Sequence, residues 1–180
     1  MDYRSIATER ISCDPPAAGQ RRLVVRYGGE KRVSFQTPQG RVRVVKTMYA
    51  TQMHRIVTHH TVPHFEAFLE SVMSRVQSSA GLDPRTRVDM AMQHMSVTDE
   101  SMVYGPDGNV YDDDLVEGNE YLVACIVALT GVWVSLSDGG SVLSWGPVWE
   151  ADHVKVYDTL KRRETGRVFF NGKPFFRLDE

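Results

Sequence analysis

Apolar and polar residues alternate with a period of two in the first third of the chain. In 33–36 a valine and a phenylalanine alternate with polar residues, and in 41–44 two valines alternate with Arg41 and Arg43. Such alternation is typical of strands with one buried face. It predicts two strands that carry basic side chains on their polar face, with turns at 28–29 and 38–40.

The spacing changes at 63–79, where apolar residues recur every three or four positions and predict one amphipathic helix. Thr61 is a candidate N-cap, Pro63 suits the first turn and Gly81 can end the helix. The members of the apolar stripe are Phe65, Phe68, Leu69, Val72, Met73 and Val76. We expect this helix to cap a β core.

Strand patterns return in the second half of the chain. A hairpin is predicted over 102–111 around the turn 105–108, followed by a long strand over 121–134 in which Gly131 marks a bulge or bend. A turn at 138–140 and a strand at 154–157 complete the pattern. The predicted fold class is mainly β with one main amphipathic helix.

The 180 residues, 42% of them hydrophobic, are enough for one core. We expect a flexible N-terminal arm at 1–20, a β domain at 21–160, and a basic and aromatic tail at 161–180. The tail forms either an extra hairpin around Asn171 and Gly172 or a mobile contact segment. With no signal peptide or long apolar run, we expect a soluble intracellular protein without a membrane partner. The two cysteines, Cys13 and Cys125, indicate no disulfide framework.

Charge is distributed unevenly. Residues 1–55 hold eleven Lys or Arg and four Asp or Glu, a balance of +7, whereas 56–120 hold three and twelve, a balance of −9. The basic segment also contains aromatic residues. Cations neutralise phosphates and rings stack on bases, so this mixture is typical of proteins that bind single-stranded nucleic acid. The candidates in this segment are Arg26, Tyr27, Lys31, Arg32, Phe35, Arg41, Arg43, Lys46 and Tyr49.

Aromatic residues also occur late in the chain. Trp145 and Trp149 flank a Gly-Pro pair and are expected to form a partly exposed platform, whereas Trp133 is expected to lie at least partly in the core. Phe35 has the same alternative, because it occupies the apolar phase of its strand.

Signatures of catalysis are absent: the chain has no GxGxxG, Walker loop, GxSxG or HExxH motif. The histidines His54, His59, His60 and His64 form the best candidate metal group, but a structural role is favoured because no cysteine or carboxylate pair completes a ligand set. The acidic run 112–114 is interpreted as a solvated loop. We therefore predict no enzyme activity, metal or cofactor.

Three stretches follow one another along the chain: VSFQTPQGRV at 33–42, MVYGPDGNVYDDDLVEGNEYLVACIVALTGVWV at 102–134, and SVLSWGPVWEADHVKVY at 141–157. In this order they resemble the OB-fold single-stranded DNA-binding proteins of tailed phages and nucleo-cytoplasmic large DNA viruses. Gln36 and Thr37 match the "QTP" element, Trp133 and Trp145 match aromatic strand ends, and Lys155 lies in the closing "VKV" strand.

The resemblance implies an OB-like β-barrel that coats single-stranded DNA during viral replication or recombination, without catalysis. It also implies self-association as a homodimer, contacts with replication proteins, and a location at the site of viral DNA replication in the host cell. The phage relatives end in a long acidic tail, whereas this chain has a basic and aromatic tail that ends in Asp179 and Glu180.

Two other functions remain open. The first is a viral protein–protein interaction scaffold that does not bind nucleic acid. The second is a small hydrolase or nuclease that uses the histidine group.

Overall fold

The computed structural model describes residues 2–17, 19–29, 32–46, 51–56, 62–87, 92–110, 115–160, 167–170 and 173–177. One long helix, α1 (Pro63–Ala80), is accompanied by three short 3-10 turns, η1 (Tyr3–Ser5), η2 (Thr8–Arg10) and η3 (Pro84–Thr86). The first strands are β1 (Ile11–Cys13), β2 (Arg22–Leu23), β3 (Val25–Tyr27), β4 (Val33–Gln36), β5 (Gly40–Lys46) and β6 (Thr51–Ile56). They are followed by β7 (His94–Tyr104), β8 (Glu120–Leu136), β9 (Val142–Leu160), β10 (Arg167–Phe170) and β11 (Lys173–Arg177).

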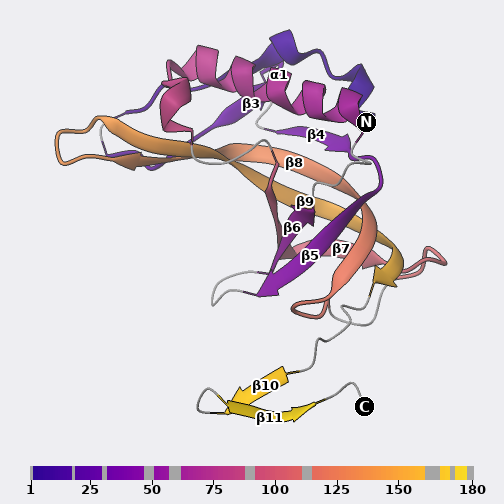
Figure 1. Cartoon of the computed structure of the whole chain (residues 1–180). Helices are drawn as coiled ribbons and strands as arrows, with labels where there is room; N and C mark the ends of the chain where they lie inside the picture. Colours follow the sequence, from indigo (N-terminus) through magenta and orange to yellow (C-terminus); the bar gives the residue numbers. More distant parts are fainter. Residues whose placement is uncertain are drawn as a thin grey trace.

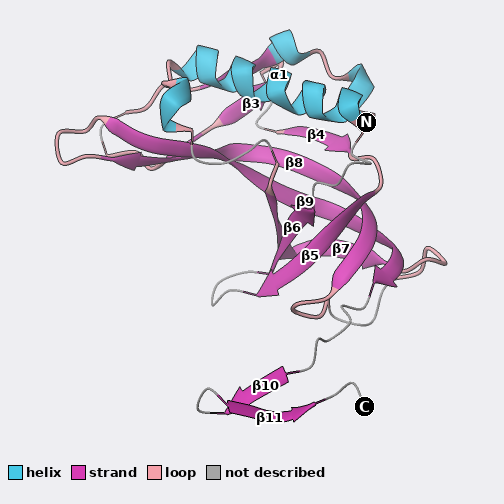
Figure 2. Cartoon of the chain, in the orientation of Figure 1, coloured by secondary structure: helices cyan, strands magenta, loops and turns pink. Residues whose placement is uncertain are grey.

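Five of these strands pair in a closed ring. The order is β5, β6, β7, β9 and β8, and β8 returns to β5; the β7–β9 pairing is parallel and the others are antiparallel. Strands β2 and β4 add to the same sheet by pairing with β8. Figure 2 shows the predominance of strands and the single long helix. The predicted class, mainly β with one main helix, is confirmed, and the expected barrel corresponds to this ring of five strands.

Strand β8 is the central strand of this sheet because it pairs with four others, β2, β4, β5 and β9. It pairs with β9 along nearly its whole length, and the register shifts at several points, including between Leu129 and Gly131. A Cβ atom at Gly131 would lie 2.7 Å from the carbonyl oxygen of Leu23 on β2. The irregularity predicted at Gly131 is confirmed, and its cause is the close approach of a neighbouring strand.

Helix α1 lies across β4 and β8 (Figure 1). Its buried residues are Phe65, Leu69, Val72, Met73, Val76 and Ala80, and the rings of Phe65 and Phe68 contact Phe35 on β4. Gly81 ends the helix in the left-handed region with φ of 65°, as predicted. The residue at the N-cap is Val62, whose side chain makes no capping bond, and Thr61 lies outside the described residues.

The expectation of a flexible N-terminal arm is wrong for residues 2–13, which pack against the rest of the protein. Tyr3, Ile6, Ile11 and Cys13 are buried, and β1 pairs with β3. The backbone N–H of Cys13 donates to Ser79 Oγ at 2.8 Å, which attaches this segment to α1. The few apolar residues of this segment are spaced too irregularly to show a period. They are buried because the segment packs against α1.

The turns predicted at 28–29, 105–108 and 138–140 are present, but the turn predicted at 38–40 is wrong. Strands β4 and β5 both pair antiparallel with β8 and follow one another along it in the same direction, so the chain does not reverse between them. The N–H of Gly105 donates to the carbonyl of Asn109 at 2.9 Å, and Ser137 and Ser141 close the β8–β9 turn at 2.9 Å. In the tail, β10 pairs antiparallel with β11, as in the hairpin alternative, although residues 171 and 172 lie outside the described part. Within the described ranges, no helix has the length and apolar character needed to cross a membrane.

Candidate nucleic-acid interface

The face of β8 and β9 that points away from the core forms a continuous strip. On β8, Tyr121, Val123 and Cys125 are buried, whereas Leu122 and Ile126 alternate with them and are partly exposed; Ala124 has the same phase as Leu122 and Ile126 but is only 7% exposed. Strand pairing places Arg41 beside Leu122 and Lys155 beside Ala124. We call this surface the outer strip and define it by the outward residues of β5, β8, β9 and β7.

The middle of the outer strip carries aromatic rings. The rings of Tyr104 and His153 are stacked with centroids 5.9 Å apart and an interplanar angle of 25°. The ammonium of Lys155 lies 5.3 Å from the centroid of Tyr157. Tyr104 is paired with Lys155, which is also the partner of Ala124, so an aromatic ring, a cation and a small residue lie in one row. All three aromatic residues are partly exposed.

At the β5 end of the outer strip, two arginines share one carboxylate. Arg41 and Arg43 each donate to Glu120 at 2.7 Å. The hydrogen bond from Arg43 is the main reason that the pKa of Glu120 lies below its usual range; Arg41 lowers it further, and partial burial opposes both. Because both guanidinium groups are close to half exposed, this cluster keeps one uncompensated positive charge at the surface.

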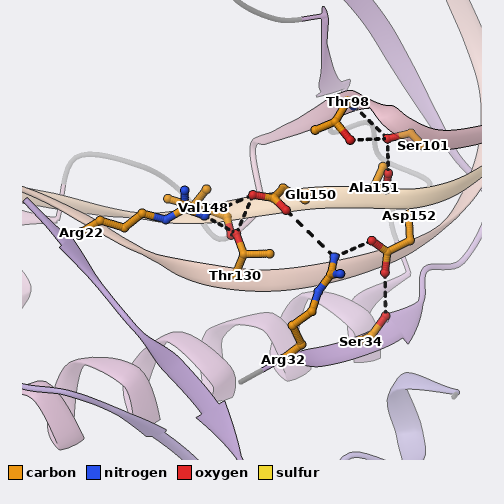
Figure 3. A network of polar contacts seen from close by, with 10 residues as sticks. All are labelled: Arg22, Arg32, Ser34, Thr98, Ser101, Thr130, Val148, Glu150, Ala151 and Asp152. Carbon is orange, nitrogen blue, oxygen red and sulfur yellow. Dashed lines mark hydrogen bonds and ion pairs between the residues drawn. The ribbon is translucent and has the colours of Figure 1, made fainter. Parts of the chain in front are cut away.

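At the opposite end, Figure 3 shows a network of polar contacts that joins β2, β4 with the preceding Arg32, β7, β8 and β9. Arg22 pairs with Glu150 at 3.1 Å, and Arg32 pairs with Asp152 at 2.5 Å. Thr130 donates to Glu150 at 3.0 Å. These carboxylates balance the two arginines, so this end is polar but close to neutral.

The outer strip is therefore less positive than the basic sequence predicts. Five cations, Arg22, Arg32, Arg41, Arg43 and Lys155, lie on or beside this surface together with the carboxylates Glu120, Glu150, Asp152 and Asp158, and β7 adds the exposed Asp99 and Glu100. The negative residues of the middle and last thirds of the chain are brought beside the basic first third. Among the described residues, Lys155 is the one of these five cations that forms no ion pair.

The prediction of a partly exposed tryptophan platform is wrong. Trp145 and Trp149 are 0% and 2% exposed, because their positions on β9 alternate with the outward ones. Phe35 is 0% exposed and lies with its ring 5.7 Å from that of Trp149, so it belongs to the core, as the alternative interpretation held. Trp133 is partly exposed.

The other predicted residues are divided between several places. Arg26 pairs with Asp14 at 3.0 Å on the β1–β3 ribbon, and Tyr27 lies under Arg10 at 4.8 Å, so neither joins the outer strip. Gln36 is exposed and pairs with Ile126 of the outer strip. Lys46 is exposed at the end of β5. Lys31 and Tyr49 lie outside the described residues.

Sequence reasoning missed Tyr104, His153 and Tyr157. A usable signal was present, because 153–157 alternates polar or aromatic residues with two valines, the same period that identified the early strands. The sequence did not show that β7 lies beside β9, which places Tyr104 against His153.

Within the described ranges, no three His, Cys, Asp or Glu side chains lie close enough together to hold a metal ion. The rings of His54 and His94 lie 4.2 Å apart on β6 and β7, and His64 is exposed on α1. His59, His60 and the acidic run 112–114 lie outside the described residues.

Fold and site define the class as a mainly β protein whose ring of strands presents a partly exposed aromatic and cationic face. No protein-family model matches the chain, and no curated protein matches it. Among solved structures, the chain is similar to the single-stranded DNA-binding protein from bacteriophage Enc34, with a TM-score of 0.46 and 10% sequence identity. The alignment covers 88% of this chain and 96% of that protein.

Proposed function

We propose that this protein binds single-stranded DNA along the outer strip and does no catalysis. The observation that carries the proposal is the row of Tyr104, Lys155 and Ala124 beside the stacked ring of His153. A strand laid across this row stacks bases on the rings while Lys155 meets a phosphate. Ala124 has no bulk to obstruct a base. Base–aromatic stacking contributes about 1–3 kcal/mol per base with little sequence preference.

The ion pairs at the ends of the outer strip shape this binding. A phosphate that contacts Arg41 or Arg32 replaces a carboxylate that is already there, so these contacts contribute less than those of free cations. Stacking then supplies much of the affinity. We expect the affinity to depend only weakly on salt, because fewer phosphates are effectively contacted than there are cations. Each contacted phosphate adds about 0.7 to the slope of log affinity against log salt concentration.

In the cell, such binding would coat exposed strands during viral DNA replication or recombination. Self-association and contacts with replication proteins belong to the same proposal, as does a location at the site of viral DNA replication.

The test is a fluorescence-anisotropy titration with oligo-dT at two salt concentrations. Tyr104→Ala should weaken binding by roughly 5- to 150-fold, which is the loss of one stacked base. Lys155→Ala should weaken oligo-dT binding and reduce the slope of the logarithm of the binding constant against the logarithm of the salt concentration by about 0.7. Arg85→Ala is the matched control, because Arg85 is highly exposed on η3, away from the outer strip. Like Lys155→Ala, Arg85→Ala removes one positive charge, and it should change neither the affinity for oligo-dT nor its salt dependence.

A protein–protein scaffold is the second candidate. It is favoured by the paired arginines and by exposed apolar residues such as Met102 and Leu143, which are 44% and 58% exposed. Absence of oligo-dT binding at low salt would place the scaffold first. Equal weakening by Arg85→Ala and Lys155→Ala would mean instead that DNA binds through general positive charge and not along the outer strip.

A further inference from the structure

Trp133 lies on the outward face of the β8–β9 hairpin. Strand pairing places it opposite Gly146 of β9, which alternates with the buried Trp145 and so shares the outward face with Glu150. Because Glu150 belongs to the outer strip, Trp133 is an outward residue of the same surface. Its side chain is partly exposed, in contrast to those of Trp145 and Trp149.

The indole of Trp133 lies flat on the backbone of β9. A Cβ atom at Gly146 would lie 2.8 Å from Nε1 of this ring and 2.9 Å from both Cε2 and Cζ2. A point at nearly equal distance from three consecutive ring atoms, at this range, lies over the plane of the ring and not beyond its edge. Glycine at 146 therefore leaves room for the ring to cover the strand. One face of the indole is against β9, and the other face is directed away from it.

An arginine lies beside this ring. Arg22 of β2 is the cross-strand partner of Trp133 on the side opposite to Gly146, and its side chain is 56% exposed. Its Nη2 donates to Thr130 at 2.8 Å and to Glu150 at 3.1 Å, so the guanidinium is held next to these two residues (Figure 3). A cation and a flat ring thus lie side by side on the outward face.

The outer strip connects Trp133 to the row of Tyr104, Lys155 and Ala124, which we call the aromatic row. From Ala124 to Trp133 is nine positions along β8, or about 30 Å at ~3.3 Å per residue. At about 3.4 Å per stacked nucleotide, this distance corresponds to about nine nucleotides. That length is within the roughly 4–16 nucleotides that one OB fold covers.

Cations lie between the two ends of this path. The guanidinium groups of Arg32 and Arg22 are about half exposed and are held on the carboxylates of Asp152 and Glu150 on β9. A chain that runs along the hairpin therefore meets rings at both ends and positive groups between them. Single-stranded nucleic acid needs this combination, because its bases stack on rings while its phosphates require cations.

We propose that Trp133 is a second stacking position and that single-stranded DNA runs lengthwise along the β8–β9 hairpin; the inference rests on the proposed function. A base on the outer face of the indole stacks without reordering the ring, because the other face is already fixed on the β9 backbone. The neighbouring phosphate lies next to Arg22. The binding site therefore extends from the aromatic row to the far half of the hairpin.

Tryptophan fluorescence tests this inference in the unmodified protein. Trp145 and Trp149 are 0% and 2% exposed, so a neutral quencher such as acrylamide acts mainly on Trp133. Oligo-dT of about 16 nucleotides should protect Trp133 and lower the quenching constant. An unchanged quenching constant with the protein saturated by oligo-dT would overturn the inference.

Two substitutions separate stacking from bulk. Trp133→Leu keeps an apolar side chain but removes the ring, and it should weaken binding of the long oligo-dT by roughly 5- to 150-fold, the loss of one stacked base. Trp133→Phe keeps a smaller flat ring and should retain part of the affinity. Leu143→Ala is the matched control, because Leu143 is 58% exposed on the same hairpin. It should leave the affinity unchanged.

Urea unfolding of the same variants identifies a purely structural role, in which Trp133→Leu loses stability but binds oligo-dT as the wild type does. That result would refute the inference. If Trp133→Leu fails to fold, Trp133→Phe and the acrylamide measurement decide, and full affinity in Trp133→Phe together with no protection of the wild type refutes it.

The length of the oligonucleotide tests the lengthwise path. An oligo-dT of about four nucleotides is too short to span the ~30 Å between the two positions. It still binds at the aromatic row when Trp133 is replaced, so its affinity should fall no more than roughly twofold, the share of one of two sites. Equal losses for the short and the long oligonucleotide would contradict the path.

The outcomes separate the two proposals. If oligo-dT binds and depends on Tyr104 and Lys155 but not on Trp133, DNA binding along the outer strip stands and the second stacking position is refuted. If binding depends on Trp133 but not on Tyr104 or Lys155, the aromatic row is refuted instead. If the wild type does not bind oligo-dT at low salt, both proposals fail.

Discussion

The indole Nε1 of Trp145 on β9 donates a hydrogen bond to the backbone carbonyl of Asp83 at 3.0 Å. Asp83 is the N-cap of η3, so this bond attaches the segment after α1 to the edge of the long hairpin. Trp149, four residues later on the same strand, is as deeply buried, but its Nε1 has no hydrogen-bond partner among the described residues. The two tryptophans have similar packing and differ in this one bond.

Replacing each tryptophan by phenylalanine should separate packing from hydrogen bonding. Both variants lose ring area, but Trp145→Phe also leaves the Asp83 carbonyl without its partner, at a cost of about 1–3 kcal/mol. Trp149→Phe removes an unpaired N–H and should cost less by about 1 kcal/mol or more. Urea unfolding followed by circular dichroism measures both free energies of unfolding. Equal losses would show that the Trp145 bond contributes no net stability.

Gly131→Ala should destabilise the protein by about 1–3 kcal/mol, because its Cβ atom would lie 2.7 Å from the Leu23 carbonyl oxygen and would push β2 away from β8. Gly139→Ala is the matched control in the β8–β9 turn. Its nearest atom would be Ser137 Oγ at 3.8 Å, and its change should stay within about 0.5 kcal/mol. Thermal or urea unfolding tests the pair, and a neutral Gly131→Ala would contradict the close approach of β2.

The Glu120 carboxylate should make stability depend on pH in the acid range. Its pKa in the folded protein is lowered, first by the bond from Arg43, whereas the unfolded value is about 4.3. Its contribution is therefore complete above the unfolded pKa and is lost as pH falls through the folded one. Glu120→Gln should lose less stability than the wild type between about pH 5 and pH 3. Parallel pH profiles for the two proteins would refute this role.

Both cysteines should be inert in the folded protein. Burial raises the pKa of Cys125 to about 12, and burial with the nearby Asp14 charge raises that of Cys13 to about 12. The thiolate is the reactive form, so almost none is present at neutral pH. A colorimetric thiol reagent at pH 8 should label neither cysteine in the native protein and both in urea. Rapid labelling of native Cys125 would mean that the sheet opens readily at the centre of β8.

The spacing of apolar residues and the positions of turn-forming residues in the sequence predicted many of the helices and strands. The alternation at 33–36 and 41–44, the helical stripe at 63–79 and the irregularity at Gly131 each match an observed element. The part of the expected arm at 2–13 was misjudged, because Tyr3, Ile6, Ile11 and Cys13 are buried by partners distant in the sequence. Local pattern contains no information about such partners.

The candidate site depended more strongly on contacts between distant residues. The sequence determined that arginines would line one face of β5 and that β9 would alternate, because side-chain direction follows from strand geometry alone. Only the tertiary structure decided that Glu120 would neutralise part of that face, that Trp145 and Trp149 would be buried, and that Tyr104 would lie against His153. Those relationships depend on strand order and register, which are set by the packing of the whole ring and not by any one segment.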